Sequence, residues 1–167
     1  IKKLNNNCKI AVVTESETIS KVALHEDVIR INSIGMKSLS DSVDLASKYA
    51  LVNNFARICI IPADLMELNF NDFKKLLNYP IKNNSLVICP SKDFGTNALM
   101  VSPVNGIKFL YGPKSFLKYL NEAKKNNMHS AILPLSSFKF DLDTTKDLNE
   151  FLRNYPSFLK KDTLDVM

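Results

Sequence analysis

The chain has 167 residues, of which 46% are hydrophobic, and its 22 basic and 17 acidic residues give a net charge of +5. This length and composition fit one soluble globular domain and exclude a disordered chain. No apolar run approaches the roughly 18 residues that span a bilayer, and residues 1–7 lack the apolar core of a signal peptide. We therefore expect a cytoplasmic protein with no membrane partner. The basic residues are scattered rather than gathered into one stripe, so we expect no nucleic acid partner either.

Strand and helix patterns alternate along the chain. Continuous apolar runs predict strands at residues 9–14, 28–31, 57–61, 86–90, 98–101 and 131–133, because strands buried on both faces of a parallel sheet have this pattern. Helical spacing predicts helices at residues 15–26, 38–52, about 70–79, 114–126 and 145–153. In the first of these, Ile19, Val22 and Ala23 share one side. The alternation predicts an α/β fold with a mostly parallel central sheet, helices on both faces and a single domain over residues 1–167.

Residues 140–145 contain an acidic pair, and the stretch predicts a further short strand, over residues 140–143, that leads into a helix. In an extended segment Asp141 and Asp143 project from the same face. Carboxylates that close raise one another's pKa unless a cation lies between them, and Mg²⁺ prefers such oxygen ligands. Thr144 can cap the helix that follows, with Asp147 reinforcing its first turn. The alternative is a surface strand whose two acids are simply solvated.

A third acid, Asp64, follows the most apolar predicted strand. Pro62 has no N–H and ends the hydrogen-bond ladder there, so the chain leaves the sheet at this point. Ligands of open α/β sheets bind at the carboxyl ends of the strands, which is where Asp64, Asp141 and Asp143 are expected. Together they could hold one or two Mg²⁺ ions. Alone, Asp64 could equally be a surface acid near a helix.

The four glycines include two in candidate binding loops. Gly95 lies between two predicted strands, where a glycine allows close approach to a ligand, and the Thr96 hydroxyl and Asn97 amide can bind an anionic oxygen. The alternative is an ordinary turn.

The other candidate loop leads into a predicted helix. Backbone amides after Gly112, the Ser115 hydroxyl and the helix dipole could cradle a phosphate or carboxylate there, and Lys114 adds positive charge. The alternative is a helix cap, and Pro113 in the first turn suits both interpretations.

Four segments, in this order and spacing, resemble the 2-phospho-L-lactate guanylyltransferases: residues 61–65, 95–99, 112–116 and 141–144. The resemblance implies the three-layer nucleotidyltransferase fold of the molybdopterin-guanylyltransferase and sugar-nucleotidyltransferase type. It also implies transfer of GMP from GTP to 2-phospho-L-lactate, phosphoenolpyruvate or 3-phosphoglycerate with release of pyrophosphate, in coenzyme F-420 biosynthesis, by a Mg²⁺-dependent homodimer.

Residue by residue, the resemblance assigns Asp64, Asp141 and Asp143 to the magnesium and catalytic site, and Thr96, Gly112 and Ser115 to the phospho-acid site. Gly95, Asn97 and Lys114 are added to the binding residues from their place in the same two loops. The alternatives are a related molybdopterin or sugar-phosphate nucleotidyltransferase and a non-catalytic nucleotide-binding paralogue.

Two departures from the family pattern affect these expectations. The family begins with a strand and a basic loop around the nucleotide phosphates, and Ile1 corresponds to a point after that loop. Either the chain is a fragment of a longer protein or the loop is lost; we favour the fragment, because omitting a central strand would expose the edges of its neighbours. In addition, Phe94 stands where the family has a glycine, which alters the shape of the loop before Gly95.

Overall fold

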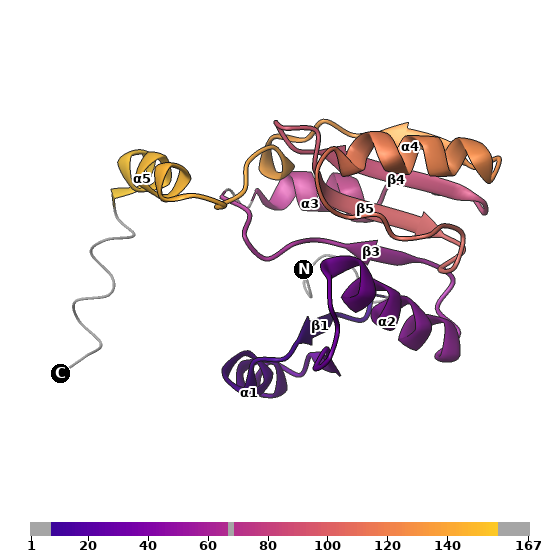
Figure 1. The fold of residues 1–167 in the computed structure, drawn as a ribbon, viewed down its shortest axis with the longest axis horizontal. Helices are drawn as coiled ribbons and strands as arrows, with labels where there is room; N and C mark the ends of the chain where they lie inside the picture. Colours follow the sequence, from indigo (N-terminus) through magenta and orange to yellow (C-terminus); the bar gives the residue numbers. More distant parts are fainter. Residues whose placement is uncertain (1–7, 67–68, 157–167) are drawn as a thin grey trace.

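Helices and strands alternate through most of the computed structural model, which describes residues 8–66 and 69–156 (Figure 1). In chain order they are β1 (Ala11–Thr14), α1 (Glu17–His25), β2 (Ile29–Asn32), α2 (Leu39–Val52), β3 (Ile58–Ile60), α3 (Phe70–Leu77), β4 (Ser85–Pro90), β5 (Thr96–Ser102), α4 (Ser115–Lys125), β6 (His129–Ile132), the 3₁₀ turn η1 (Ser136–Phe138) and α5 (Thr145–Asn154). None of the helices in the described ranges is long and apolar enough to cross a membrane.

The larger sheet has the strand order β3-β5-β4-β6. β4 and β6 are parallel, whereas β5 is antiparallel to both β3 and β4. β3, β4 and β6 therefore run in one direction and only β5 opposes them. The reason is the short connection at residues 91–95, which joins β4 to β5 without the helix that a parallel crossover needs.

Two apolar clusters cover the two faces of this sheet, because alternate residues of a strand point to opposite faces. Leu86 and Ile88 of β4 pack in the cluster that includes side chains of α2 and α4. Val87 and Cys89 pack in the other, with side chains of α3 and η1. The predicted α/β fold with helices on both faces of a central sheet is thus confirmed.

β1 and β2 form a separate parallel pair. Within the described residues β1 pairs only with β2, and β3 pairs only with β5, so each has an unpaired edge. Helix α2 contacts both β1 and β3 and lies between the two sheets (Figure 1). No residue of β1 or β3 is fully buried, whereas all residues of β5 and all residues of β4 before Pro90 are buried.

Helix α1 covers the β1–β2 pair less completely than the sequence predicts. Ala23 and Ser20 are buried, but Ile19 and Val22 are 50% and 59% exposed. Ile19, Val22 and Ala23 share one side of the helix, but only Ala23 of the three is buried. Amphipathic spacing identified the apolar side of the helix, but a two-stranded pair is too narrow to cover all of it.

The helix caps agree with the sequence. Thr144 caps α5, its hydroxyl accepts from the Asp147 amide at 3.2 Å, and Asp147 accepts from the Thr144 amide at 2.8 Å. This is the reciprocal capping box that residues 144–147 predict.

Candidate functional site

Three loops meet at the carboxyl edge of the larger sheet, which is formed by the ends of its strands and not by the side of an outer strand. β3, β4 and β6 all end at this edge, and β5 begins there, because it runs in the opposite direction. The loops are residues 61–66 after β3, 91–95 between β4 and β5, and 133–143 after β6. All the predicted acids and the residues around Gly95 belong to these loops or to the start of β5.

A backbone bridge joins the loop of Asp64 to that of Asp141. The Leu142 amide donates to the Asp64 carbonyl at 2.8 Å, and the Met66 amide donates to the Phe140 carbonyl at 3.1 Å. These two bonds flank a single antiparallel pair, Leu65 opposite Asp141. The predicted strand over residues 140–143 is therefore reduced to one bridge position, and it exists because the loop after β3 supplies a partner.

The register of the bridge also orients the acids. Residues directly opposite each other in an antiparallel pair share a face, and their neighbours point to the other face. Leu65 therefore shares a face with Asp141, and Asp64 lies on the opposite one. Consistent with this, no group of three or more His, Cys, Asp or Glu side chains in the described parts of the chain is arranged to hold a metal ion.

The carboxyl group of Asp141 has a raised pKa. Its partial burial is the main cause, and the negative charges of Asp143 and Asp93 add to it. A neighbouring cation would oppose both effects, because it stabilises the ionised carboxylates. The chemistry of Asp141 and Asp143 therefore fits a hard divalent cation.

Asn97 lies beside this acidic pair at the start of β5. Its side-chain amide is close enough to lower the pKa of Asp141, although its Nδ2 makes no hydrogen bond of normal length and angle among the described residues. Asn97 is only 3% exposed. A buried amide donor without a partner is costly, so an anionic oxygen of a ligand would be a favourable acceptor at this position.

Thr96 and Ser115 connect the sheet edge to helix α4. The Ser115 hydroxyl donates to Thr96 Oγ1 at 2.9 Å, and both residues are buried. The Phe116 amide donates to the Phe94 carbonyl at 3.1 Å. The loops that contain Gly95 and Gly112 are thus adjacent, as a shared binding site requires.

The start of α4 differs in detail from the predicted amide cradle. The amide of Ser115 donates to the Gly112 carbonyl at 3.0 Å, and those of Phe116 and Leu117 are also hydrogen bonded. Gly112 and Lys114 are exposed, and both have positive φ, 113° and 55°. The groups at this end that face solvent are therefore the turn at Gly112 and the Lys114 side chain.

Gly95 is required by its own loop. A Cβ atom here would lie 2.6 Å from Ser91 Oγ and 3.1 Å from Asp93 Oδ1. Asp93 accepts a hydrogen bond from the Ser91 hydroxyl and one from the Gly95 amide, and these bonds lower its pKa. Phe94, at the family's glycine position, has φ of 66°, a left-handed conformation that glycine adopts more easily.

Sequence reasoning missed three features of this edge. Asp93 lies near enough to raise the pKa of Asp141, and its place two residues before a glycine was a turn signal that could have identified it. Lys92 and Lys139 both lie over the Phe140 ring, with Nζ 5.3 and 5.5 Å from its centroid. No motif marked these lysines, because the contact depends on the tertiary fold.

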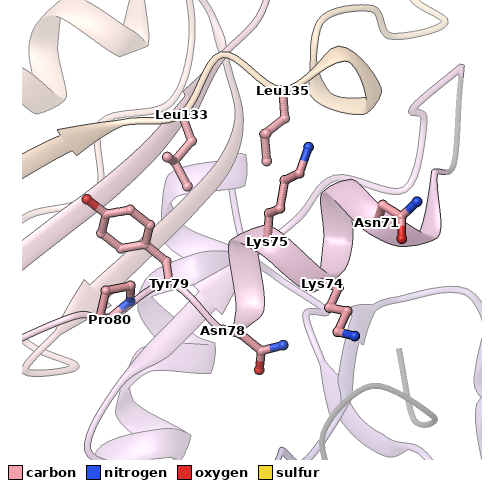
Figure 2. A pocket seen from close by; sticks show the side chains of 8 residues that line it. All are labelled: Asn71, Lys74, Lys75, Asn78, Tyr79, Pro80, Leu133 and Leu135. Atoms are coloured by element: carbon pink, nitrogen blue, oxygen red, sulfur yellow. The ribbon is translucent and has the colours of Figure 1, made fainter.

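A surface depression of about 660 Å³ lies elsewhere, beside α3 (Figure 2). Leu133 and Leu135 point into it from the loop after β6, facing Tyr79 and Lys75. None of the predicted site residues lines it. It is open and apolar, and we assign it no role in the site.

Comparison with protein families gives a match over residues 1–164 to the family described as guanylyl transferase CofC like. A 3-phospho-D-glycerate guanylyltransferase of Colwellia psychrerythraea is 35% identical over 141 residues, covering 83% of this chain and 66% of that protein. A 2-phospho-L-lactate guanylyltransferase of Methanosphaera stadtmanae is 34% identical, over 69% of this chain and 48% of that protein. The chain thus spans about half to two thirds of the length of these curated relatives.

The fold comparison agrees. A crystal structure from Desulfovibrio desulfuricans G20, assigned to the nucleotide-diphospho-sugar transferases, superposes with a TM-score of 0.63 over 96% of this chain and 73% of that one. Sequence identity is 15%, so this likeness concerns the fold alone. It confirms the expected nucleotidyltransferase-like architecture.

Proposed function

Because the chain belongs to the CofC-like guanylyl transferase family, we propose that it transfers GMP from GTP to a phosphorylated three-carbon acid and releases pyrophosphate. The observation that carries this proposal is the family match over residues 1–164. The names of relatives give three acceptors. The relative with 35% identity is named for 3-phosphoglycerate, one with 34% identity for 2-phospho-L-lactate, and one with 32% identity for phosphoenolpyruvate.

For the metal, we propose that Asp141 and Asp143 bind Mg²⁺, and that Asp64, which the bridge register places on the opposite face, joins them through a rearrangement of its loop when the cation binds. The support is the raised pKa of Asp141, which burial and neighbouring carboxylates cause and which a cation would reverse. When bound, the cation would offset negative charge on the phosphates of the substrate and the departing pyrophosphate.

For the acceptor, we propose the neighbouring group of Thr96, Gly112 and Ser115, with Gly95, Asn97 and Lys114 beside it. The support is that one hydrogen bond joins Thr96 to Ser115 and that Asn97 has an unused donor. Lys114 would attract the anionic acid, and the amide of Asn97 would bind one of its oxygens.

The chemistry needs little beyond this positioning. The attacking phosphate oxygen of the acceptor is ionised at neutral pH, so no general base is required. The residues would hold that oxygen in line with the α-phosphorus of GTP, while the P–O bond to pyrophosphate breaks. This accounts for a candidate site rich in carboxylates and hydroxyls.

We further propose that the protein is a cytoplasmic homodimer in coenzyme F-420 biosynthesis, as the family resemblance implies. We also propose that one further strand, from a longer protein, pairs with the open edges of β1 and β3 to complete a single domain. This proposal is supported by the unpaired edges of β1 and β3 among the described residues and by their half-buried apolar side chains. The amides of Val13 and Cys59 face the open edges, because the neighbouring residues in each strand are turned toward β2 and β5. Slower amide exchange at Val13 and Cys59 in the full-length protein than in residues 1–167 alone would establish it, and equal exchange would disprove it. Light scattering tests the dimer.

The experiment that tests the reaction is pyrophosphate release by the full-length protein with GTP and Mg²⁺, offering the three acids in parallel. We expect release that depends on one of them. Asp143→Asn should lower this activity by more than about 100-fold, because the exposed carboxylate serves the cation and not the core. Asp27→Asn is the matched control, because Asp27 is exposed and has a left-handed conformation that asparagine tolerates.

Two results would contradict this proposal. Silence with all three acids, from folded protein that binds GTP, would favour a related nucleotidyltransferase or a non-catalytic binding protein. Full turnover by Asp143→Asn would overturn the metal assignment.

A further inference from the structure

Outside the proposed site, one carboxylate is buried and has an unusual set of partners. Asp72 lies in the first turn of α3 and is only 6% exposed. A first-turn acid commonly interacts with its own helix end and with solvent. Asp72 instead faces η1, which follows it by more than sixty residues in the chain.

Its partners are the residues that open η1. Asp72 Oδ2 accepts from the Ser136 hydroxyl at 2.9 Å and from the amide and hydroxyl of Ser137, both at 3.2 Å. Lys75 Nζ lies 3.5 Å from Oδ1. Burial alone would raise the pKa of Asp72, but these hydrogen bonds outweigh it and hold the pKa below its usual value. The carboxylate is therefore ionised and bonded at neutral pH.

A second bond ties the same two segments. Ser137, 1% exposed, accepts from the Asn69 amide at 3.0 Å through its hydroxyl oxygen. The residues that follow Asp72 and Ser137 also meet, since the rings of Phe73 and Phe138 pack with centroids 5.0 Å apart. We call this group of Asn69, Asp72, Ser136 and Ser137 the α3–η1 clasp.

Each of the two segments that the clasp joins lies close in sequence to a loop that carries the candidate acids. Asn69 follows Met66 by three positions, and Ser137 precedes Phe140 by three. Met66 and Phe140 are hydrogen bonded in the bridge that joins the loops of Asp64 and Asp141. The two segments are thus held at two points, the clasp and the bridge.

We propose that Asp72 is a positioning residue that keeps these two segments in register and thereby sets the placement of Asp64 relative to Asp141 and Asp143. Its catalytic consequence rests on the proposed guanylyltransferase function, whereas its effect on the bridge does not. A bridge of one residue pair has two backbone hydrogen bonds and no neighbouring ladder, so it needs support from outside. Without the clasp the loops after β3 and β6 would separate while the sheet remained folded.

The test uses the full-length protein and compares Asp72→Asn with Ser47→Ala. Ser47 is buried on the other side of the sheet and donates to the Val104 carbonyl at 3.1 Å, so its loss removes a buried hydrogen bond far from the clasp in sequence. Hydrogen exchange is measured at the Met66 and Leu142 amides, with Val101 of β5 as the internal reference. Steady-state kinetics with GTP and the preferred acid are measured in parallel.

We expect Asp72→Asn to speed exchange at Met66 and Leu142 by at least about 10-fold more than at Val101, because exchange at Val101 reports the loss of global stability and the excess reports local opening. Its kcat should fall by about 10- to 100-fold, the usual effect of losing a group that orients a metal ligand. KM for the acid should change little, because Thr96 and Ser115 are untouched. Ser47→Ala should show neither effect at matched stability.

Ser136→Ala provides a milder variant in case Asp72→Asn does not fold. It deletes only the 2.9 Å bond and keeps those from Ser137, so it should show the same pattern at smaller size. Unchanged exchange at Met66 and Leu142 in folded variants overturns the proposal, and so does faster exchange with full kcat. If the unaltered protein proves inactive with all three acids, the proposed function fails and the exchange result alone decides the role of Asp72.

Discussion

The larger sheet and the β1–β2 pair are built from similar apolar runs but differ in burial. All residues of β5 and all residues of β4 before Pro90 are buried, and apolar clusters cover both faces of these strands. In β1 and β2, which pair only with each other among the described residues, Ile31 is buried and the other residues are half-buried or exposed. The difference shows that a strand sequence supplies its full stabilisation only when both edges and both faces are covered.

The largest effect that separates the two regions should come from their cores. Leu86→Ala in β4 should lower the free energy of unfolding by about 2–5 kcal/mol, because the side chain is fully buried. Val22→Ala in α1 should change it by less than about 0.5 kcal/mol, because Val22 is 59% exposed. Chemical denaturation measures both. Equal losses would mean that another surface covers α1 in solution.

The next effect concerns the edge of the larger sheet, where function and stability should oppose each other. Because the folded-state pKa of Asp141 is raised, its ionisation costs folding free energy at pH values above that pKa. Asp141→Asn should therefore raise the melting temperature at pH 7 while lowering turnover by more than about 100-fold. Thermal melts at pH 7 and 3 test the sign, since the stabilisation should vanish in acid. A lowered melting temperature at pH 7 would show that Asn97 outweighs burial.

A smaller effect is expected at Asp72, whose pKa shift has the opposite sign. Its lowered folded-state pKa means that it contributes stability above the unfolded-state value of about 3.9, and this contribution is lost as the pH falls through the folded-state pKa. Asp72→Asn should cost about 1–3 kcal/mol at pH 7 and progressively less in acid. Urea titrations at several pH values measure this. Lys75 and Cys89 are the other titratable groups near Asp72, and burial raises the pKa of Cys89 to about 12, far above this range.

The smallest effect compares one strained residue from each region. Phe94 at φ 66° and Asp27 at φ 52° both have left-handed conformations. Phe94→Gly should stabilise the protein by about 0.5–1 kcal/mol, since glycine has no Cβ penalty but loses more entropy on folding. Asp27→Gly should gain less, because aspartate tolerates this conformation better. Equal changes in denaturation midpoint would argue against strain at Phe94.

Much of the fold follows from local sequence. The run at residues 86–90 predicts a strand buried on both faces and is one, and Thr144 with Asp147 predicts a helix cap and forms it. These predictions succeed because strand formation and helix capping depend largely on residues near one another in the chain, whereas the degree of burial of each strand depends on what covers it. The placement of Asp64 and Asp141 at one sheet edge follows from the same logic, since each ends a strand or the loop after it.

Other features were decided by the tertiary structure. Whether Ile19 and Val22 are covered depends on the width of the sheet that α1 meets, which helical spacing does not encode. The face on which Asp64 lies depends on its pairing register with a segment more than seventy residues away. Asp72 gave no signal beyond a first-turn acid, because its burial comes from η1. The sequence by itself determined the elements and the acids at their ends, whereas long-range packing and hydrogen bonding decided which of those groups meet.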